Sequence, residues 1–411
     1  AGCRRAASRP WDRIRRTHRS DPPTVAPREP RDRWCRAVDR AHRDRLATTC
    51  PPFSHLGPRE QGDYGVDVAD VRETLAIQAT ACRNLGSIQY ADLLEAFVDD
   101  HDRGGPVVAL LAGRSDRPLH DALPLRLLGA LHRAALLGRA PELAARFPSC
   151  GGDGAPIDLA VVYRVVDRLR NDVEDGLRRG VQTNEVGRAV CHLAIANWLP
   201  TIGIDTFDWL EVGASAGLNL SFDQYAADTG QGVLGRIGSP LTFPSSMFTV
   251  APPVGTAARC ASRRGCDPDP IDLEQDAVRL ESFVWPDQSM RRARLLAAIA
   301  ITRPWRHRID RASADDWIAA RLAEPSDHPA VIFHSIVWQY MAPEVQVRFR
   351  DAISEAGRQG RDLVWARMEP AGPIADLRAD VWSTGRLTRY HVADVGYHGQ
   401  NFSWLGARLS D

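Results

Sequence analysis

Residues 206–217, TFDWLEVGASAG, constrain the fold more than any other stretch of the chain. The first seven residues are rich in apolar and β-prone side chains, and a turn with glycines at 213 and 217 follows at once. A strand that runs directly into a glycine turn is typical of α/β proteins, in which such turns meet ligands at the carboxyl end of a sheet. The stretch therefore predicts a buried strand that ends in a ligand-binding turn.

One interpretation of this turn is a nucleophile. Residues 213–217 fit G-x-S-x-G, the strained turn that exposes the serine of α/β-hydrolases, here Ser215. His398 could then act as the base and Asp394 as the acid. The chain lacks the upstream H-G-G-G oxyanion motif, however, and the acid lies only four residues before the histidine. A serine esterase or hydrolase is therefore kept as the alternative function.

The other interpretation is a nucleoside-binding turn of the form E-x-G-x-x-x-G. Glu211, at the end of the strand, could accept from an amine or balance a cationic ligand. Gly213 and Gly217 would let the backbone approach that ligand, with Ser215 in the place of a middle glycine. A helix that begins after the turn would add free N–H groups. This interpretation uses more of the residues.

Composition excludes several classes of site. The chain of 411 residues holds 52 basic residues, and all of them are arginine. A P-loop lysine, a Schiff-base lysine and a lysine general base are thereby excluded. Eight cysteines are scattered without a C-x-x-C motif, which favours reduced thiols, a cytoplasmic location and no metal site. The sequence contains no apolar run of about 20 residues, so no membrane span is predicted.

Three regions are predicted along the chain. Residues 1–65 are expected to form a disordered extension rich in Arg and Pro; its basic excess is interrupted by prolines and has few aromatics, so nucleic acid is not an expected partner. Helical periodicity predicts an all-helical domain over 70–200, including one helix at 157–180 and another at 184–200 that Pro200 ends. Residues 203–411 are predicted to form an α/β domain with an irregular insertion at about 224–285.

The α/β prediction depends on strands that alternate with helices. Strands are expected at 206–212, within 330–340 and at 362–370, with an amphipathic helix at 344–357. Residues 388–399 are interpreted as two short strands around a turn. Strands separated by helices imply a mostly parallel sheet covered on both faces. The expected fold is a Rossmann-like, methyltransferase-type sheet with a closing β-hairpin.

Several blocks together resemble a known family. They are QATACRNLGSIQYADLL, LHRAALLGRAPELAARFPSCGG, GVQTNEVGRAV, LEVGASAGLNL, RRGCDPDPID, FVWPDQSMRRARLLAAIAI, VIFHSIVWQYM and YHGQNFSWL. In this order they are similar to the DUF2332 family, uncharacterised bacterial proteins best known from actinobacteria, over roughly residues 70–408. The resemblance implies a helical region joined to a methyltransferase-like Rossmann domain, and it implies no activity.

The candidate site residues follow from these patterns. The cofactor-binding candidates are Glu211, Gly213, Ser215, Gly217, Asn219 and Asp267, the catalytic candidates are His334 and Ser335, and the substrate-binding candidates are Asn184, Glu185, Arg188, Asp287 and Arg291. Arg188 or Arg291 would hold an anionic substrate group. Structural explanations stay open for several: Thr183 or Asn184 as a helix cap, Asp287 as an N-cap with Arg291 as its i+4 partner, the aspartates at 267, 269 and 272 as Asx turns, and His334 as a structural histidine.

The preferred function is a cytosolic methyltransferase that uses S-adenosylmethionine, or a related nucleoside-binding protein, acting on a small-molecule substrate. In this hypothesis His334 is a base or orients the substrate. Methyl transfer needs mainly the alignment of nucleophile and sulfonium, so strong acid–base motifs are not required. A non-catalytic interaction module is the third alternative.

Overall fold

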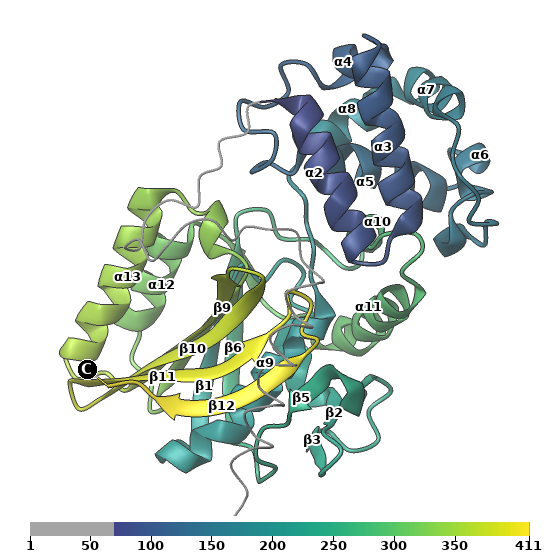
Figure 1. The fold of residues 1–411 in the computed structure, drawn as a ribbon. Coiled ribbons are helices and arrows are strands. Elements are labelled where there is room, and N and C mark those ends of the chain that lie inside the picture. The colour runs from purple at the N-terminus through teal and green to yellow at the C-terminus, as the bar shows by residue number, and fades with distance from the viewer. Residues whose placement is uncertain (1–69, 411) are drawn as a thin grey trace, which may run out of the picture. The chain divides into compact units, whose positions relative to one another are not determined.

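The computed structural model describes residues 70–410, and the predicted extension 1–65 lies outside them. The described chain begins with a group of helices: α2 (Val71–Asn84), α3 (Ile88–Asp102), α4 (Pro106–Leu111), α5 (Leu123–Leu136), α6 (Pro141–Ala144), α7 (Leu159–Arg168) and α8 (Arg170–Arg178). These helices pack around a shared apolar core (Figure 1). None of the helices in the described part of the chain is both long and apolar enough to cross a membrane.

The helix predicted over 157–180 is two helices. Leu169, between α7 and α8, has φ −111° and ψ 31°, which is outside the helical region. Val162 and Val166 before the break and Val173 and Leu177 after it are all buried. The apolar spacing therefore predicted the buried face correctly, whereas the break is a local backbone change that the spacing does not report.

A nine-stranded sheet forms the larger part of the described chain, and the fold is mixed α/β. Its strands are β1 (Thr206–Val212), β5 (Phe248–Val250), β6 (Arg259–Asp267), β7 (Ile309–Arg311), β8 (Ala330–Ser335), β9 (Leu363–Ala371), β10 (Ile374–Ser383), β11 (Arg386–Val395) and β12 (Phe402–Arg408). Their order is β5-β12-β11-β10-β9-β8-β1-β6-β7. The predicted mostly parallel sheet is confirmed, because five of its eight pairings are parallel.

The parallel strands β7, β6, β1, β8 and β9 place β1 in the middle. The chain moves outward from β1 through β6 to β7, then returns to the other side of β1 for β8 and β9. The strand order thus reverses between β1 and β8, and in open α/β sheets ligands bind outside the carboxyl ends of the strands at such a point. The turn at 213–217 follows β1 on this edge.

Helices cover both faces of the sheet (Figure 1). The helices α12 (Ala314–Ala323) and α13 (Pro343–Arg358) pack on one face. On the other face lie α9 (Ala189–Trp198) and α11 (Ser289–Thr302). All ten residues of α9 are buried, which is expected for a helix that is apolar on every side. These helices leave the carboxyl ends of β1 and β8 facing residues 182–188 and the loop at 396–401.

The predicted irregular insertion at 224–285 is wrong in part. It contains a small sheet of β2 (Ala226–Asp228), β3 (Val233–Gly235) and β4 (Thr242–Phe243), and then β6, which pairs in parallel with β1 in the central sheet. Only the last three residues of β6 pair with β7, so the rest of that side of the strand is an open edge. Polar residues are tolerated there, and β6 therefore lacks the apolar run of a central strand.

The predicted hairpin at 388–399 is also wrong. Residues 386–395 form one strand, β11, and the tight turn lies before it at Thr384 and Gly385, which have φ 49° and 81°. Two successive residues with positive φ give the turn whose twist matches a β-hairpin. The four strands β9, β10, β11 and β12 are thus paired antiparallel in succession, and β5 pairs in parallel with β12 at the edge of the sheet.

One element crosses the predicted domain boundary at about residue 200. The helix α10 (Ala277–Ser282) and Trp285 pack against the first group of helices. His132 on α5 lies 3.0 Å from the carbonyl oxygen of Ser282. The division into domains at 70–200 and 203–411 stays a prediction.

Candidate functional site

The turn after β1 has an alternating left-handed backbone. Gly213, Ser215 and Gly217 have φ values of 72°, 53° and 72°. A Cβ at Gly213 would lie 2.4 Å from a Val337 methyl carbon, and one at Gly217 would lie 2.8 Å from Ile309. Glycine is therefore required at both positions, and Ser215 adopts the strained conformation of a middle glycine. The serine keeps the backbone shape of a G-x-G-x-G turn.

The amides of this turn are mostly engaged within the protein. The amides of Gly213 and Ala214 donate to the carbonyl of Cys266, and that of Gly217 donates to Ala214. Side chains accept from two others: Asp267 from Ser215 at 2.9 Å and Asn184 from Leu218 at 2.9 Å. The expected row of free N–H groups is therefore wrong for this structure. The α-helix expected after the turn is wrong as well, because a short 3-10 helix, η4 (Asn219–Gln224), stands there.

Gln182 closes the turn, and the sequence patterns did not single it out. Its amide nitrogen donates to Asp267 at 3.1 Å, and its amide oxygen accepts from the Ser215 hydroxyl at 2.8 Å. Asp267 ends β6, next to the end of β1, and its other oxygen contacts are the amides of Ser215 and Asp269. The hydrogen bond from the Asp269 amide to the Asp267 side chain forms an Asx turn, which was the structural explanation left open for these aspartates.

Glu211 and Asn219 are buried beside the turn with unsatisfied oxygen atoms. Glu211 is 3% exposed, and its Oε2 accepts no hydrogen bond from any described residue. The Oδ1 of Asn219 is likewise buried without a donor. His192 on α9 places its Nε2 at 3.4 Å from Glu211 Oε1, which is an ion pair when the imidazole is protonated, and this nitrogen makes no hydrogen bond with any described residue. Buried polar atoms without partners are rare in native proteins, so these acceptors require an explanation.

The catalytic candidates lie at the end of β8, as predicted, but His334 is fully buried. Its Nδ1 lies 2.6 Å from Glu369, and its Nε2 accepts from the indole of Trp365 at 3.0 Å. Both ring nitrogens are engaged, which is the structural role left open above. The carbonyl of Ser335 accepts from Arg188, and Ile336 follows with φ 51°. Glu369, on β9, was not found from the sequence.

The segment before α9 holds a buried ion pair. Arg291 donates through Nε and a terminal nitrogen to one oxygen of Glu185, at 3.0 and 2.6 Å. Burial alone would raise the pKa of Glu185, but Arg291, His398 and Arg188 outweigh it and lower this pKa to about 2. The capping explanation for Asn184 is wrong, because its side chain bonds to Leu218 while Glu185 accepts from the Gly187 amide.

Asp287 contacts the start of α3 rather than the segment before α9. Its carboxylate accepts from the Ser87 hydroxyl at 2.6 Å and from the Gln89 amide at 3.2 Å, so it caps the start of α3 rather than its own helix. Gln288 precedes α11 instead. The predicted i+4 pair between Asp287 and Arg291 is wrong, because the guanidinium of Arg291 turns to Glu185.

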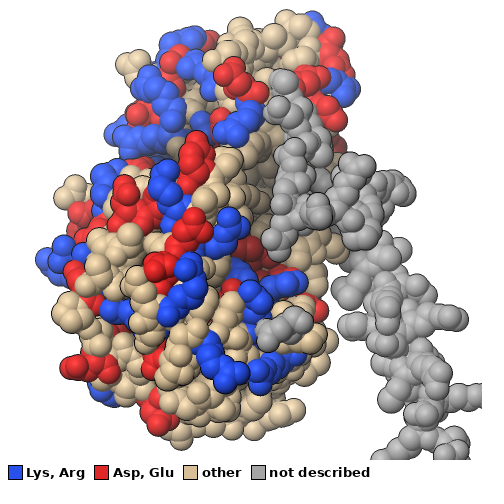
Figure 2. Space-filling view, turned by 90° about the vertical axis from the view of Figure 1, so that its left-hand side faces the viewer, with Lys and Arg blue, Asp and Glu red and all other residues tan. Residues whose placement is uncertain are grey.

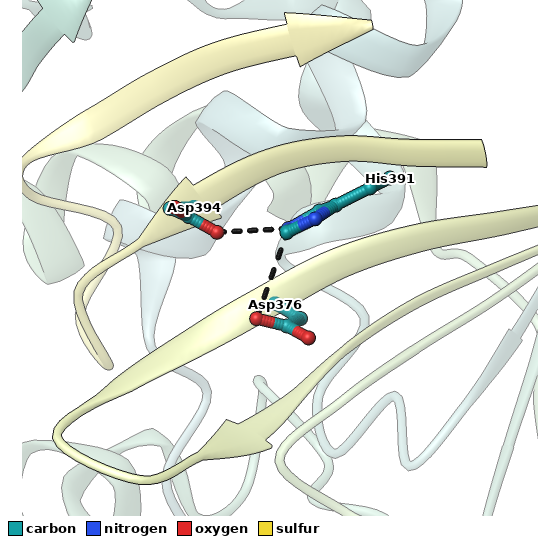
Figure 3. Close-up of side chains that lie close together, drawn as sticks. All are labelled: Asp376, His391 and Asp394. Atoms are coloured by element: carbon teal, nitrogen blue, oxygen red, sulfur yellow. Dashed lines mark ion pairs between the residues drawn. The ribbon is translucent and has the colours of Figure 1, made fainter. Parts of the chain in front are cut away.

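The structure does not assemble the hydrolase triad. Ser215 is 2% exposed, and its hydroxyl bonds to Gln182; within the described part of the chain no histidine bonds to it. Asp394 lies 2.8 Å from the Nε2 of His391, not beside His398. Figure 3 shows His391, on β11, between Asp394 of the same strand and Asp376 of β10. The side-chain atoms of these three residues that could bind a metal ion all lie within 4.8 Å of one another. Arg378 also pairs with Asp376, so this group is explained as an ion-pair network.

Two of the pockets in the described structure are lined in part by arginines. The smaller one lies at the ion pair and is lined by Asn184, Glu185 and Arg291 together with apolar side chains of α10 and α11. The larger one lies among α5, α8 and α10, and its arginines are paired: Arg133 with Asp276, Arg139 with Asp172 and Arg279 with Asp269. On the face shown in Figure 2, basic and acidic side chains are interspersed.

Comparison with known proteins gives a family and no activity. Neither a curated protein nor a solved structure matched the chain. The model of the family described as "Uncharacterized protein conserved in bacteria (DUF2332)" matches residues 72–404, which include the described helices and nearly the whole sheet. The chain therefore belongs to this DUF2332 family.

Proposed function

We propose that this protein binds S-adenosylmethionine or a related nucleoside at the carboxyl ends of β1 and β6, and that it is a methyltransferase. The observation that carries the proposal is the pair of buried acceptors beside the turn. Glu211 Oε2 and Asn219 Oδ1 have no donors among the described residues. An ammonium or sulfonium-bearing ligand would supply the hydrogen bonds or the positive charge that these oxygens lack.

Further support comes from the strand order and the backbone. The parallel strands follow the order of doubly wound nucleotide-binding sheets, with the reversal beside β1. The left-handed positions at 213, 215 and 217 have the shape of a glycine-rich nucleotide turn. Asp267, on the neighbouring strand, has the position of an acid that accepts from ribose hydroxyls.

Ligand binding would require one rearrangement. Gln182 now makes the contacts with Asp267 and Ser215 that ribose hydroxyls would make. A nucleoside would therefore displace the Gln182 side chain, which also donates to the Asp269 carbonyl at 3.0 Å, and the affinity would be lower by the free energy of these three hydrogen bonds. The turn would then offer ligand contacts through side chains more than through amides, since most of its amides are engaged.

The test is isothermal titration calorimetry of the purified full chain with S-adenosylmethionine. The Glu211→Gln variant keeps the size of the side chain but removes its charge, and we expect it to weaken binding about tenfold or more. The control is Glu355→Gln, on the surface of α13, where binding should be unchanged. Absence of binding by the wild type at millimolar ligand, or equal binding by the Glu211→Gln variant, would overturn the proposal.

A further inference from the structure

Three segments that are far apart in the sequence meet beside Gly187. They are residues 186–188, the helix α11 and the loop at 396–401. A Cβ at Gly187 would lie 2.1 Å from the His398 carbonyl oxygen and 3.0 Å from a terminal nitrogen of Arg294. A Cβ at Gly399 would lie 2.1 Å from the Gly187 carbonyl oxygen. The backbones touch, so the side chains of Arg188, Arg294 and His398 are brought to one place.

These side chains have donors that the protein does not use. Arg294 is half-buried; its guanidinium carbon lies 5.4 Å from the centre of the Phe243 ring, and its side chain has no hydrogen-bond acceptor in residues 70–410. The imidazole of His398 is half-buried and also lacks a partner within this range. Arg188 uses two of its three nitrogens, which donate to the carbonyls of Tyr397 and Ser335.

The surrounding carboxylates do not balance the arginines. Glu185 is already bonded to Arg291. Glu369 is bonded to His334 and to the amide of Val337 through Oε1, while its Oε2 is buried without a partner among residues 70–410. Three guanidinium groups, those of Arg188, Arg291 and Arg294, therefore face two carboxylates, which leaves an excess of one positive charge. Burial lowers the pKa of Arg188 and of Arg294, and Arg291 lowers the pKa of Arg294 further, so the charged state costs free energy in this arrangement.

The position of this group is that of a ligand site. Arg188 donates to the Ser335 carbonyl at the end of β8, beside the point where the strand order reverses. The pocket between α5, α8 and α10 differs from this group because its arginines are paired with aspartates. Surplus positive charge is therefore found at the edge of the sheet where an anion could reach it.

We propose that Arg188, Arg294 and His398 form a site for an oxyanion, the carboxylate or phosphoryl group of a small-molecule ligand. The placement on the ligand edge of the sheet rests on the proposed function, but the charge excess does not. Arg188 and Arg294 would supply charge-assisted hydrogen bonds, and His398 would add a neutral donor. Arg291 is then a positioning residue for Glu185 rather than the anion-binding group expected from the sequence.

The first test is thermal unfolding of the full chain with sodium acetate or sodium phosphate, with sodium chloride at equal ionic strength as the reference. We expect both oxyanions to raise the melting temperature with millimolar midpoints, and we expect Arg294→Gln to weaken that response about tenfold or more. The control is Arg292→Gln, which removes a guanidinium from the same helix that is paired with Glu281. This variant should respond like the wild type.

A merely structural arginine would give a different result. Because Arg294 carries uncompensated charge, Arg294→Gln should leave the ligand-free protein as stable as the wild type or more stable, while it loses the oxyanion response. A less stable variant that responds to acetate and phosphate like the wild type would overturn the proposal. So would a wild type that responds to neither oxyanion.

A second arm identifies the source of the oxyanion. S-adenosylmethionine carries a carboxylate, and 5′-methylthioadenosine does not. If Arg294→Gln weakens the binding of S-adenosylmethionine only, the site holds the nucleoside's own carboxylate. If the variant binds both nucleosides like the wild type but has lost the acetate response, the site holds a substrate's oxyanion. If the protein binds acetate or phosphate but neither nucleoside, the oxyanion site stands and the proposed function is wrong.

Discussion

The turn after β1 and the arginine group beside Gly187 are both at the carboxyl edge of the sheet, yet they are incomplete in opposite ways. At the turn the amide donors are engaged, while the acceptor oxygens of Glu211 and Asn219 have no donor among the described residues. In the arginine group three guanidinium groups face the two carboxylates of Glu185 and Glu369, and Arg294 and His398 have no acceptor in the same part of the chain. One region lacks a donor or a cation, and the other lacks an anion.

The two regions also differ in how visible they are in the sequence. The motif that the sequence makes most visible, residues 213–217, is closed by Gln182 and by neighbouring carbonyls. The arginine group has no motif, yet it keeps surplus charge that its own carboxylates do not neutralise. Unsatisfied polar groups in a folded protein cost free energy, and they are concentrated where binding or catalysis requires them.

The largest effect is expected for Glu185→Gln, which makes the arginine group still more positive. Removing one partner of a buried ion pair typically costs about 3–5 kcal/mol, and the Glu185–Arg291 pair is nearly fully buried. Urea unfolding should therefore show a loss of that size in the free energy of unfolding. The contrast between the two regions is supported further if phosphate raises the free energy of unfolding of this variant by more than it raises that of the wild type. A loss as small as that of Glu355→Gln, at an exposed pair, would contradict the importance of the charge balance.

A smaller effect is expected from pH. Burial first, and then Arg291, lower the pKa of His398 to about 4, with Arg188 and Arg294 acting in the same direction and Glu185 opposing them. The fold therefore favours neutral His398: its contribution to stability is complete above the ordinary pKa of 6.5 and is lost as the pH falls from there through about 4. The loss should not exceed about 3 kcal/mol.

Unfolding between pH 7 and 4 measures this effect, with His398→Asn as the variant that should flatten the profile. Sulfate stays ionised over this range, and bound at the arginine group it should reduce the acid-induced loss in the wild type but not in Arg294→Gln. Identical profiles for the wild type and the His398→Asn variant would show that another group causes the acid sensitivity.

The smallest effect is expected at the turn. The Gln182→Ala variant frees Asp267 and Ser215 without removing a ligand contact, so S-adenosylmethionine should bind about fivefold more tightly, the equivalent of about 1 kcal/mol for the displaced hydrogen bonds. Calorimetry of the variant and the wild type measures the change. Weaker binding by Gln182→Ala would mean that Gln182 contacts the ligand rather than closing the turn, and the contrast between the two regions would then need revision.

Much of the fold could be predicted where the signal is local. β1 was expected at 206–212 and occurs there, and the expected helix at 344–357 lies within α13, because side-chain periodicity follows from the geometry of a single element. β6 was not found, because whether a polar strand is tolerated depends on how far the neighbouring β7 extends. The place of the hairpin turn at 384–385 was missed because Thr384 adopts a positive φ that only its glycine neighbour suggests.

The candidate site divides in the same way. The sequence by itself determined that residues 213–217 form a turn after a buried strand, that no lysine takes part in any site and that arginine supplies every permanent positive charge, since chain order and composition specify these facts. Only the tertiary structure decided that Gln182 closes the turn, that Arg291 is neutralised by Glu185 and that Arg294 and His398 keep donors that no residue of 70–410 accepts. Hydrogen-bond partners and charge balance depend on segments about 30 to 200 residues apart, and only folding brings these segments into contact.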